Sequence, residues 1–386
     1  MKKILVVLSI LTMALGFSAF DCSSAELTGA KMYIAQKHYD KAKESLLKEV
    51  TKNPLNDEAW YYLGYLYGEQ DSVNAMINAF NKSLSISKKF EKDIDEFKKY
   101  TWQTSFNKGV SEFNAAVKTT KQDSMKIHFE KAAELFKNST LCEPDSTIGY
   151  ENLVSVYFNL NETGEAKPAL EKLVSLGKTP SSFAQLGQLY NVEGGKAMDS
   201  YRASKNIADS TKAMESYSKA IEVLKNGQSK YPTDSDILLQ LGNAYYSSGE
   251  VDVALSSFKS LVEKDPSNKD FRYAYGVVLM KARNYPDAVS QLEEAVKMDP
   301  KNTDAIYNLA AAYINWGNLL RDAAVKAESD DKSYQEKFGS AVPYLEKYLE
   351  AKPTDSRVWY SLGQVYANMG QQAKAEDAFK KAEQYK

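Results

Sequence analysis

The sequence predicts an all-α protein built from repeated pairs of helices, and three observations lead to this prediction. A Leu-Gly-x-x-Tyr motif occurs four times, beginning at Leu63, Leu186, Leu241 and Leu362. Roughly twelve residues after such a motif comes a second one, Ala-x-x-x-Phe or Ala-x-x-x-Leu, as at Ala254. Matching small residues then recur with a period of 34, at Gly242, Gly276 and Ala310. Internal repetition with such a period is the signature of a repeat array.

These motifs and their period resemble the tetratricopeptide repeat, in which each unit is a helix A, a turn and a helix B. The resemblance covers essentially the whole chain after residue 22, and it implies a right-handed superhelical solenoid of about nine units. With the small residue at position 8, the units begin near residues 23, 57, 103, 147, 180, 235, 269, 303 and 356.

Each repeated residue type has a physical role in such a unit. Apolar residues at positions 4, 7, 8 and 11 lie on one face of helix A. Position 8 is small, and we expect it to face the Ala at position 20 of helix B, as Gly276 would face Ala288. A proline near position 32 ends helix B because it lacks an N–H. Asp or Asn after that proline can cap the next helix; such residues are Asn56, Asp57, Asp145, Asp234, Asp304 and Asp355.

Four departures from the period predict longer elements. Residues 91–102 fall outside it and are expected to form a helical spacer between the second and third units. The third, fifth and eighth units are longer by roughly 10 to 20 residues, and the excess lies between helices A and B. We expect extended helical hairpins there, with a loop as the alternative, and a turn at Gly194-Gly195 in the fifth unit.

The N-terminus predicts export. Met1-Lys2-Lys3 precedes an uncharged run from Ile4 to Phe20, so residues 1–22 are typical of a signal peptide, with a retained anchor as the alternative. Cys22, followed by two serines, resembles the lipidation site of bacterial lipoproteins. Cuts after Ala19 or after Ala25 compete with it. Residues 23–386 would then be a periplasmic solenoid, anchored to the outer membrane if Cys22 is acylated.

Composition disfavours most other functions. The 49 basic and 51 acidic residues give a net charge of −2, which argues against a nucleic-acid binder. Two His and two Cys supply little for catalysis or metal binding, so we expect no catalytic residue, no metal and no cofactor. Gly194-Gly195-Lys196 is not a phosphate-binding loop, because Ala197 stands where Ser or Thr would ligate magnesium. We expect Cys142 to be a lone thiol, although a disulfide with Cys22 is an alternative.

The resemblance also implies where a partner would bind. In the family, helix A lines the inner wall of the superhelix, and its positions 2, 5, 9, 12 and 13 face the groove. Tyrosine offers contact area and a hydroxyl there, and amides can bind a peptide backbone. The alternative is that these residues pack one unit on the next. The expected groove residues are Tyr61, Tyr65, Leu239, Asn243, Tyr246, Tyr273, Tyr307, Asn315, Tyr360, Gln364 and Asn368.

We therefore expect a non-enzymatic scaffold of the cell envelope that grips a protein or peptide segment in this groove. The alternative is an accessory or carrier subunit that binds a glycan or small ligand in an envelope export or assembly system. The family's clamp for chaperone C-terminal carboxylates has Lys at position 5 and Asn at position 9. Tyr273 with Val277 and Tyr360 with Gln364 do not match it, so binding of chaperone tails is disfavoured.

Overall fold

The computed structural model describes residues 24–386, and the chain divides into two compact units at Glu162 and Thr163. Eighteen helices and no strand make up this part of the chain, which confirms the predicted all-α repeat fold. The expected signal peptide, including Cys22, lies outside the described residues. Among the described helices, none has the combination of length and apolarity needed to cross a membrane.

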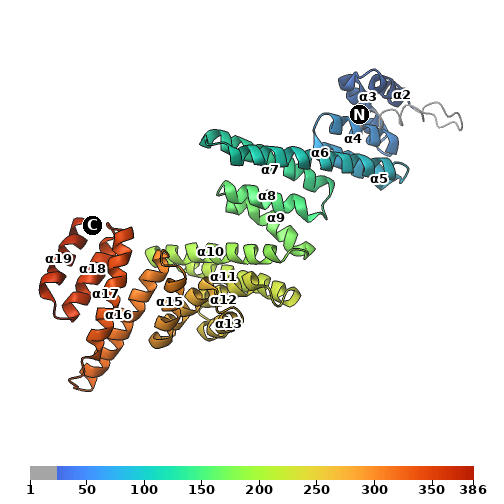
Figure 1. Cartoon of the computed structure of the whole chain (residues 1–386). Coiled ribbons are helices and arrows are strands. Elements are labelled where there is room, and N and C mark those ends of the chain that lie inside the picture. The colour runs from blue at the N-terminus through green and yellow to red at the C-terminus, as the bar shows by residue number, and fades with distance from the viewer. Residues whose placement is uncertain (1–23) are drawn as a thin grey trace. The chain divides into compact units, whose positions relative to one another are not determined.

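The N-terminal unit consists of antiparallel helix pairs followed by one further helix (Figure 1). Its helices are α2 (Ala25–Ala35), α3 (Tyr39–Lys52), α4 (Asp57–Glu69), α5 (Val73–Ile86), α6 (Glu91–Lys118), α7 (Gln122–Cys142) and α8 (Thr147–Asn159). Helices α6 and α7 form the long hairpin of the third repeat and lie side by side. The boundary between the two compact units falls inside the fourth repeat, between its two predicted helices.

Residues 91–102, expected as a separate spacer, form the first turns of α6, which continues without a break into helix A of the third repeat. Ile94 from this segment is fully buried. The side chain of Phe97 packs against the rings of Tyr65 and Phe80 in the second repeat. The added turns of α6 therefore bring apolar side chains to the second repeat. A third repeat of regular length would not supply these side chains.

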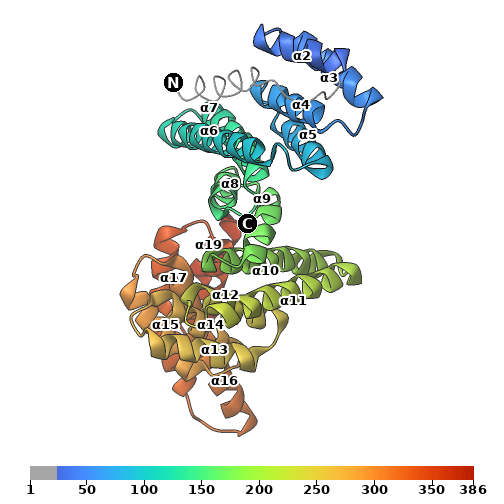
Figure 2. The ribbon, with the colours of Figure 1, turned by 90° about the vertical axis from the view of Figure 1, so that its right-hand side faces the viewer.

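The C-terminal unit consists of one helix followed by five helix pairs. Its helices are α9 (Thr163–Leu176), α10 (Pro180–Ser204), α11 (Ile207–Lys230), α12 (Ser235–Ser248), α13 (Val251–Lys264), α14 (Lys269–Lys281), α15 (Tyr285–Met298), α16 (Thr303–Lys326), α17 (Ser333–Ala351), α18 (Ser356–Asn368) and α19 (Gln372–Gln384). The pairs α10/α11 and α16/α17 are the extended hairpins predicted for the fifth and eighth units. Figure 2 shows α10 and α11 running side by side.

The turn of the first of these hairpins is not where we expected it. Gly194 and Gly195 lie inside α10, and the chain reverses at Lys205, which adopts a left-handed backbone conformation with φ of 59°. Gly194 permits close helix packing instead, because a Cβ there would lie 2.5 Å from the ring of Tyr217 on α11. A glycine pair within a helix is therefore explained here by the approach of its partner helix.

Packing within a repeat also differs from the prediction in one detail. A Cβ added to Gly276 would lie 2.6 Å from Cγ of Leu292, so the side chain that faces position 8 comes from position 24. Ala288, the expected neighbour at position 20, is fully buried, and its carbonyl oxygen lies 3.3 Å from the same point. The small alanine thus lets helix B come close, and the larger residue one turn later covers the glycine.

Side-chain caps fix the start of several A helices. Asn56, Asp234 and Asp355 accept hydrogen bonds from backbone N–H groups in the first turns of α4, α12 and α18, as the sequence predicted. For α16 the cap is Asn302, whereas Asp304 lies in the first turn of the helix. Satisfying these N–H groups ends each loop at a defined residue.

Candidate functional site

Four of the predicted groove residues come together in one cleft between α12 and α14 of the C-terminal unit. Leu239, Asn243 and Tyr246 lie on one face of α12, and Tyr273 faces them from α14. The cleft has a volume of about 230 Å³, and Asp270, Ala274, Val277 and Val278 complete its lining. It combines apolar surface with an amide, two phenol hydroxyls and one carboxylate, as a site for an extended peptide requires.

The ring of Tyr273 is held in place by the next repeat. Its hydroxyl oxygen accepts a hydrogen bond of 3.0 Å from Nδ2 of Asn308 on α16. Burial raises the pKa of Tyr273, and the charge of Asp304 raises it further, so the phenol stays protonated at neutral pH. Tyr273 therefore has a fixed orientation and can also donate a hydrogen bond from its hydroxyl.

The other predicted residues of the last two repeats have different surroundings. Tyr307 is 40% exposed, and its ring lies 5.5 Å from that of Tyr348 on α17. Tyr360 is 53% exposed and leans on Phe379 of its own helix B, with ring centroids 5.4 Å apart. The three tyrosines at position 5 do not share one cleft, and position 5 is not free of contact with helix B. Asn315 lies half-buried on α16.

Gln364 and Asn368 line a second cleft, of about 330 Å³, between α16 and α18. Here Nη1 of Arg321 donates a hydrogen bond of 2.7 Å to Oδ1 of Asn368. Arg321 and its neighbour Asn318 come from the extended part of α16, and we did not predict them as site residues. No motif in the sequence marks them, because only the packing of α16 on α18 brings them to the cleft.

Tyr61 and Tyr65, which we predicted in the groove, lie in the core of the N-terminal unit, with exposed fractions of 5% and 7%. Tyr61 stacks on Phe90 with ring centroids 4.3 Å apart, and Tyr65 meets Phe97 edge-on at 5.5 Å. Burial raises the pKa of both phenols well above its ordinary value. Aromatic residues that precede the third repeat, Phe90 and Phe97, thus occupy the place that the groove prediction left for a partner.

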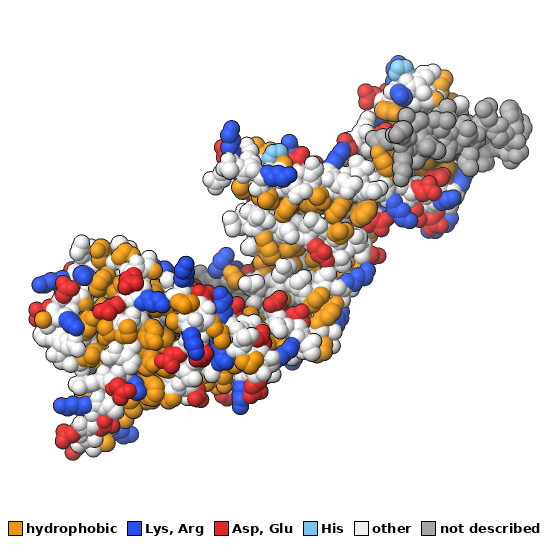
Figure 3. All heavy atoms as spheres, in the orientation of Figure 1, with side chains coloured by type: hydrophobic (Ala, Val, Ile, Leu, Met, Phe, Trp, Pro, Cys, Tyr) orange, Lys and Arg blue, Asp and Glu red, His pale blue; other side chains and the backbone are white. Residues whose placement is uncertain are grey.

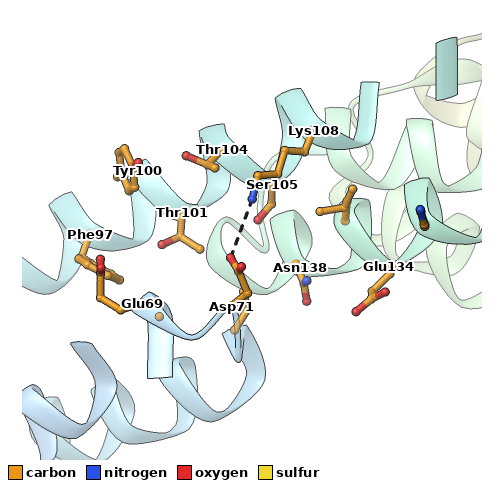
Figure 4. Close-up of a pocket in the computed structure, with 14 residues that line it drawn as sticks. Glu69, Asp71, Phe97, Tyr100, Thr101, Thr104, Ser105, Lys108, Glu134 and Asn138 are labelled. Carbon is orange, nitrogen blue, oxygen red and sulfur yellow. Dashed lines mark ion pairs between the residues drawn. The ribbon is translucent and has the colours of Figure 1, made fainter. Parts of the chain in front are cut away.

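The N-terminal unit instead has a polar cavity of about 310 Å³ that we did not predict (Figure 4). Six residues of α6 line it, namely Phe97, Tyr100, Thr101, Thr104, Ser105 and Lys108, and the lining from other elements comprises Gly68, Glu69, Asp71, Val73, Lys131, Glu134, Leu135 and Asn138. The ammonium of Lys108 lies 4.0 Å from the carboxylate of Asp71 across this cavity. Its charges of both signs lie among hydroxyl and amide groups.

The described residues contain no group of three His, Cys, Asp or Glu side chains placed to hold a metal ion. Cys142 is buried, and this burial raises the pKa of its thiol to about 12, so it is not a reactive thiolate at neutral pH. Charged side chains of both signs are interspersed over the face of the C-terminal unit seen in Figure 3. That face has no extended basic stripe.

Comparison with solved structures finds several structures titled MamA. The chain is similar to the structure titled MamA AMB-1, with 22% identity, a TM-score of 0.37, and coverage of 51% of this chain and 99% of the other. For MamA MSR-1 the identity is 21%, the TM-score 0.37 and the coverage 52% and 95%. For MamA from Desulfovibrio magneticus RS-1 the identity is 20%, the TM-score is 0.38, and the coverage is 52% of this chain and 94% of the other. No curated protein matches the sequence.

The tetratricopeptide repeat family matches the sequence directly, in both units. The matched residues are 57–90, 149–177, 207–269, 239–303, 273–325 and 344–377. Together these segments make up more than half of the chain. Repeats of this family build protein-interaction scaffolds and are generally not enzymes. With its paired helices, its small residues at position 8 and these matches, the chain belongs to the tetratricopeptide repeat family.

Proposed function

We propose that the protein is a scaffold that binds an extended peptide segment of a partner along the A helices of its C-terminal unit. The observation that carries this proposal is the α12/α14 cleft, where Leu239, Asn243, Tyr246 and Tyr273 line one depression. The amide of Asn243 and the two hydroxyls can hydrogen-bond a peptide backbone. Leu239 and the rings provide contact area for its side chains.

Affinity capture from membrane and soluble cell fractions tests this proposal. Asn243→Ala combined with Tyr246→Ala removes the polar groups that α12 offers to the cleft. A matched control, Val253→Ala combined with Ser260→Ala, changes exposed residues of helix B in the same repeat. We expect the cleft variant to lose the partner that the wild type and the control both capture, with all three equally helical. Equal capture by all three would place the binding site elsewhere.

The envelope location of this scaffold is part of the proposal and is supported by the N-terminal sequence. Ser24 is the N-cap of α2: its Oγ accepts a hydrogen bond of 3.1 Å from the N–H of Leu27 and donates one to the buried carboxylate of Glu49. Cleavage after Ala25 would remove this cap and leave Glu49 without that donor. We therefore favour processing before Ser24, with Cys22 as the lipidated first residue.

Mass spectrometry of the mature N-terminus distinguishes these cuts. We expect a chain that begins at Cys22 and carries acyl groups, and Cys22→Ala should move the protein from the membrane pellet to the soluble fraction. A mature chain that begins at Glu26 would contradict the structural argument from Ser24. Unchanged fractionation of the variant would contradict lipidation.

The polar cavity of the N-terminal unit favours a second candidate function, which is binding of a glycan or small polar ligand by an accessory or carrier subunit. Its threonine, serine and asparagine groups can exchange hydrogen bonds with sugar hydroxyls, and the ring of Tyr100 offers an apolar face. Ligand-observed NMR with short oligosaccharides tests this function. The oligosaccharide signals should no longer show binding when the protein contains Thr104→Val combined with Asn138→Leu. The α12 cleft variant should bind the oligosaccharide as the wild type does.

A further inference from the structure

The cleft between α16 and α18 has a charge of one sign, unlike the mixed cavity of the N-terminal unit. Arg321 is the only ionisable residue in its lining. The remaining polar groups there are neutral, from Asn318, Ser361, Gln364 and Asn368, and the apolar part comes from Ile314, Phe338, Val365, Ala367 and Phe379. A cleft with one cation and neutral donors is complementary to a ligand with one negative charge.

The guanidinium of Arg321 is held in this cleft by a short relay. Its Nη1 donates to Oδ1 of Asn368 at 2.7 Å, and Nδ2 of Asn368 donates to the carbonyl oxygen of Gln364 at 2.8 Å. Both acceptors belong to α18, whereas Arg321 belongs to the extended part of α16. The relay therefore fixes a long, flexible side chain before any ligand arrives, which reduces the entropy that binding would cost.

The same guanidinium retains hydrogen-bonding capacity. It has five N–H donors, and the described residues provide acceptors at Asn368 and Asp322. The carboxylate of Asp322 lies 3.3 Å from Nη2, but its side chain is 72% exposed, so this ion pair is weak in water. The amides of Asn318 and Gln364 have no hydrogen-bond partner in the described part of the chain, so they can also donate to a ligand.

We infer that this cleft binds a carboxylate of the partner peptide, with Arg321 as the charged contact. Arginine pairs with carboxylates through two parallel N–H···O bonds, and the Asn318 and Gln364 amides can donate to the remaining lone pairs. Ile314, Val365 and Phe379 offer an apolar wall to a neighbouring aliphatic side chain. A phosphate dianion would find only one cation, Arg321, for its two negative charges, so the cleft is better matched to a carboxylate. The inference rests on the proposed function, since Gln364 and Asn368 belong to the proposed groove, and it adds the chemistry of the bound group.

Three synthetic peptides that differ only at their last residue test this inference. Ac-Ser-Leu-Ile-Asp-NH2 has a side-chain carboxylate, Ac-Ser-Leu-Ile-Ala-OH has a terminal carboxylate, and Ac-Ser-Leu-Ile-Asn-NH2 has neither. Ligand-observed NMR titration of the full-length protein gives the affinity of each. We expect at least one acidic peptide to bind about tenfold or more tightly than the neutral peptide, since hydrogen bonds between charged groups are the stronger ones. The tighter acidic peptide identifies the source of the carboxylate.

Protein variants assign the effect to Arg321. Arg321→Gln should abolish the preference for acidic peptides, and Arg321→Lys should keep part of it. Arg202→Gln is the matched control, because Arg202 lies on the other extended hairpin of this unit and pairs with Asp199 at 2.9 Å. We expect it to keep the wild-type preference. Circular dichroism of each variant checks that the fold is intact.

The inference is overturned if the wild type does not discriminate acidic from neutral peptides, if none of them binds, or if Arg321→Gln keeps the preference. Failure of the proposed function is a separate result. If the α12 cleft variant still captures the partner while Arg321→Gln loses the preference for acidic peptides, the carboxylate site stands and the α12/α14 cleft is not the binding surface. If instead the α12 cleft variant loses the partner while Arg321→Gln keeps the preference for acidic peptides, Arg321 has no part in recognition and the scaffold proposal stands.

Discussion

The second and ninth repeats have a tyrosine at the same position 5 of helix A, and the two rings have opposite roles. Tyr61 in the N-terminal unit is 5% exposed and stacks on Phe90, whereas Tyr360 in the C-terminal unit is 53% exposed. The difference comes from the residues that follow each repeat. The segment before and within the start of α6 covers the second repeat with Phe90 and Phe97, and α18 has no such cover in the described chain.

This comparison shows that a position in the repeat does not decide between core and surface. The side chain at position 5 projects from helix A in both units. It becomes core where neighbouring chain brings aromatic residues onto it, as at Tyr61, and it remains accessible where no such chain covers it, as at Tyr307 and Tyr360. The candidate peptide-binding surface is therefore confined to the C-terminal unit.

The largest effect that the comparison predicts is a difference between two equivalent substitutions. Tyr61→Ala should destabilise the N-terminal unit by about 3–5 kcal/mol, because it removes a buried aromatic ring. Tyr360→Ala should change the free energy of unfolding by less than about 1 kcal/mol, because its ring is half exposed. Urea unfolding monitored by circular dichroism measures both. Similar costs for the two variants would contradict the distinction between a core and a surface tyrosine.

A second prediction concerns the independence of the two units. Ala288→Leu introduces three carbon atoms at a fully buried position of α15 and should cost about 1–3 kcal/mol by overpacking. Because a repeat touches mainly its neighbours, hydrogen exchange should rise in α14 to α17 and stay unchanged in α2 to α5. Uniform loosening from the first repeat to the ninth would show that the chain does not behave as a linear array.

A third prediction concerns pH and is specific to the N-terminal unit. Burial raises the pKa of Glu49, but hydrogen bonds from Ser24, Asn53 and Asn56 outweigh it, and the pKa is lowered from its ordinary value near 4.5. A carboxyl whose pKa is lower in the folded state adds stability above its unfolded pKa and loses it as the pH falls.

The N-terminal unit should therefore lose stability as the pH falls below about 4.5, the ordinary pKa of a glutamate. In Glu49→Gln this contribution to the pH dependence should be absent. Glu165→Gln, which changes an exposed glutamate of α9 in the other unit, is the control and should keep it. Thermal unfolding between pH 3 and pH 7 measures the three proteins. An unchanged pH dependence in Glu49→Gln would contradict the prediction.

The smallest predicted effect is the loss of one hydrogen bond in the proposed surface. Tyr273→Phe removes the acceptor of the Asn308 amide and should cost about 0.5–1.5 kcal/mol. The same substitution should weaken partner capture more than it lowers the melting temperature, if the hydroxyl also contacts the peptide. A variant that loses stability but captures the partner normally would make Tyr273 a packing residue.

Much of the fold could be predicted because its signals are local. The period of 34 residues, the small residue at position 8 and the capping residues Asn56, Asp234 and Asp355 each act within one repeat. The same reasoning placed Leu239, Asn243, Tyr246 and Tyr273 on adjacent A helices, which the structure brings into one cleft. Two local signals misled the prediction: Gly194-Gly195 reads as a turn, and Ala288 reads as the partner of Gly276.

The sequence by itself determined that the chain is an array of helix pairs, where each pair lies, and which repeats are extended. These properties depend on contacts between residues less than about 34 positions apart, which a repeated pattern records. Only the tertiary structure decided which equivalent positions stay accessible. Phe90 closes over Tyr61, and Arg321 reaches Asn368 across 47 residues, because elements of irregular length shift the packing of one repeat on another. No periodic signal encodes such a shift, since it arises where the period is broken.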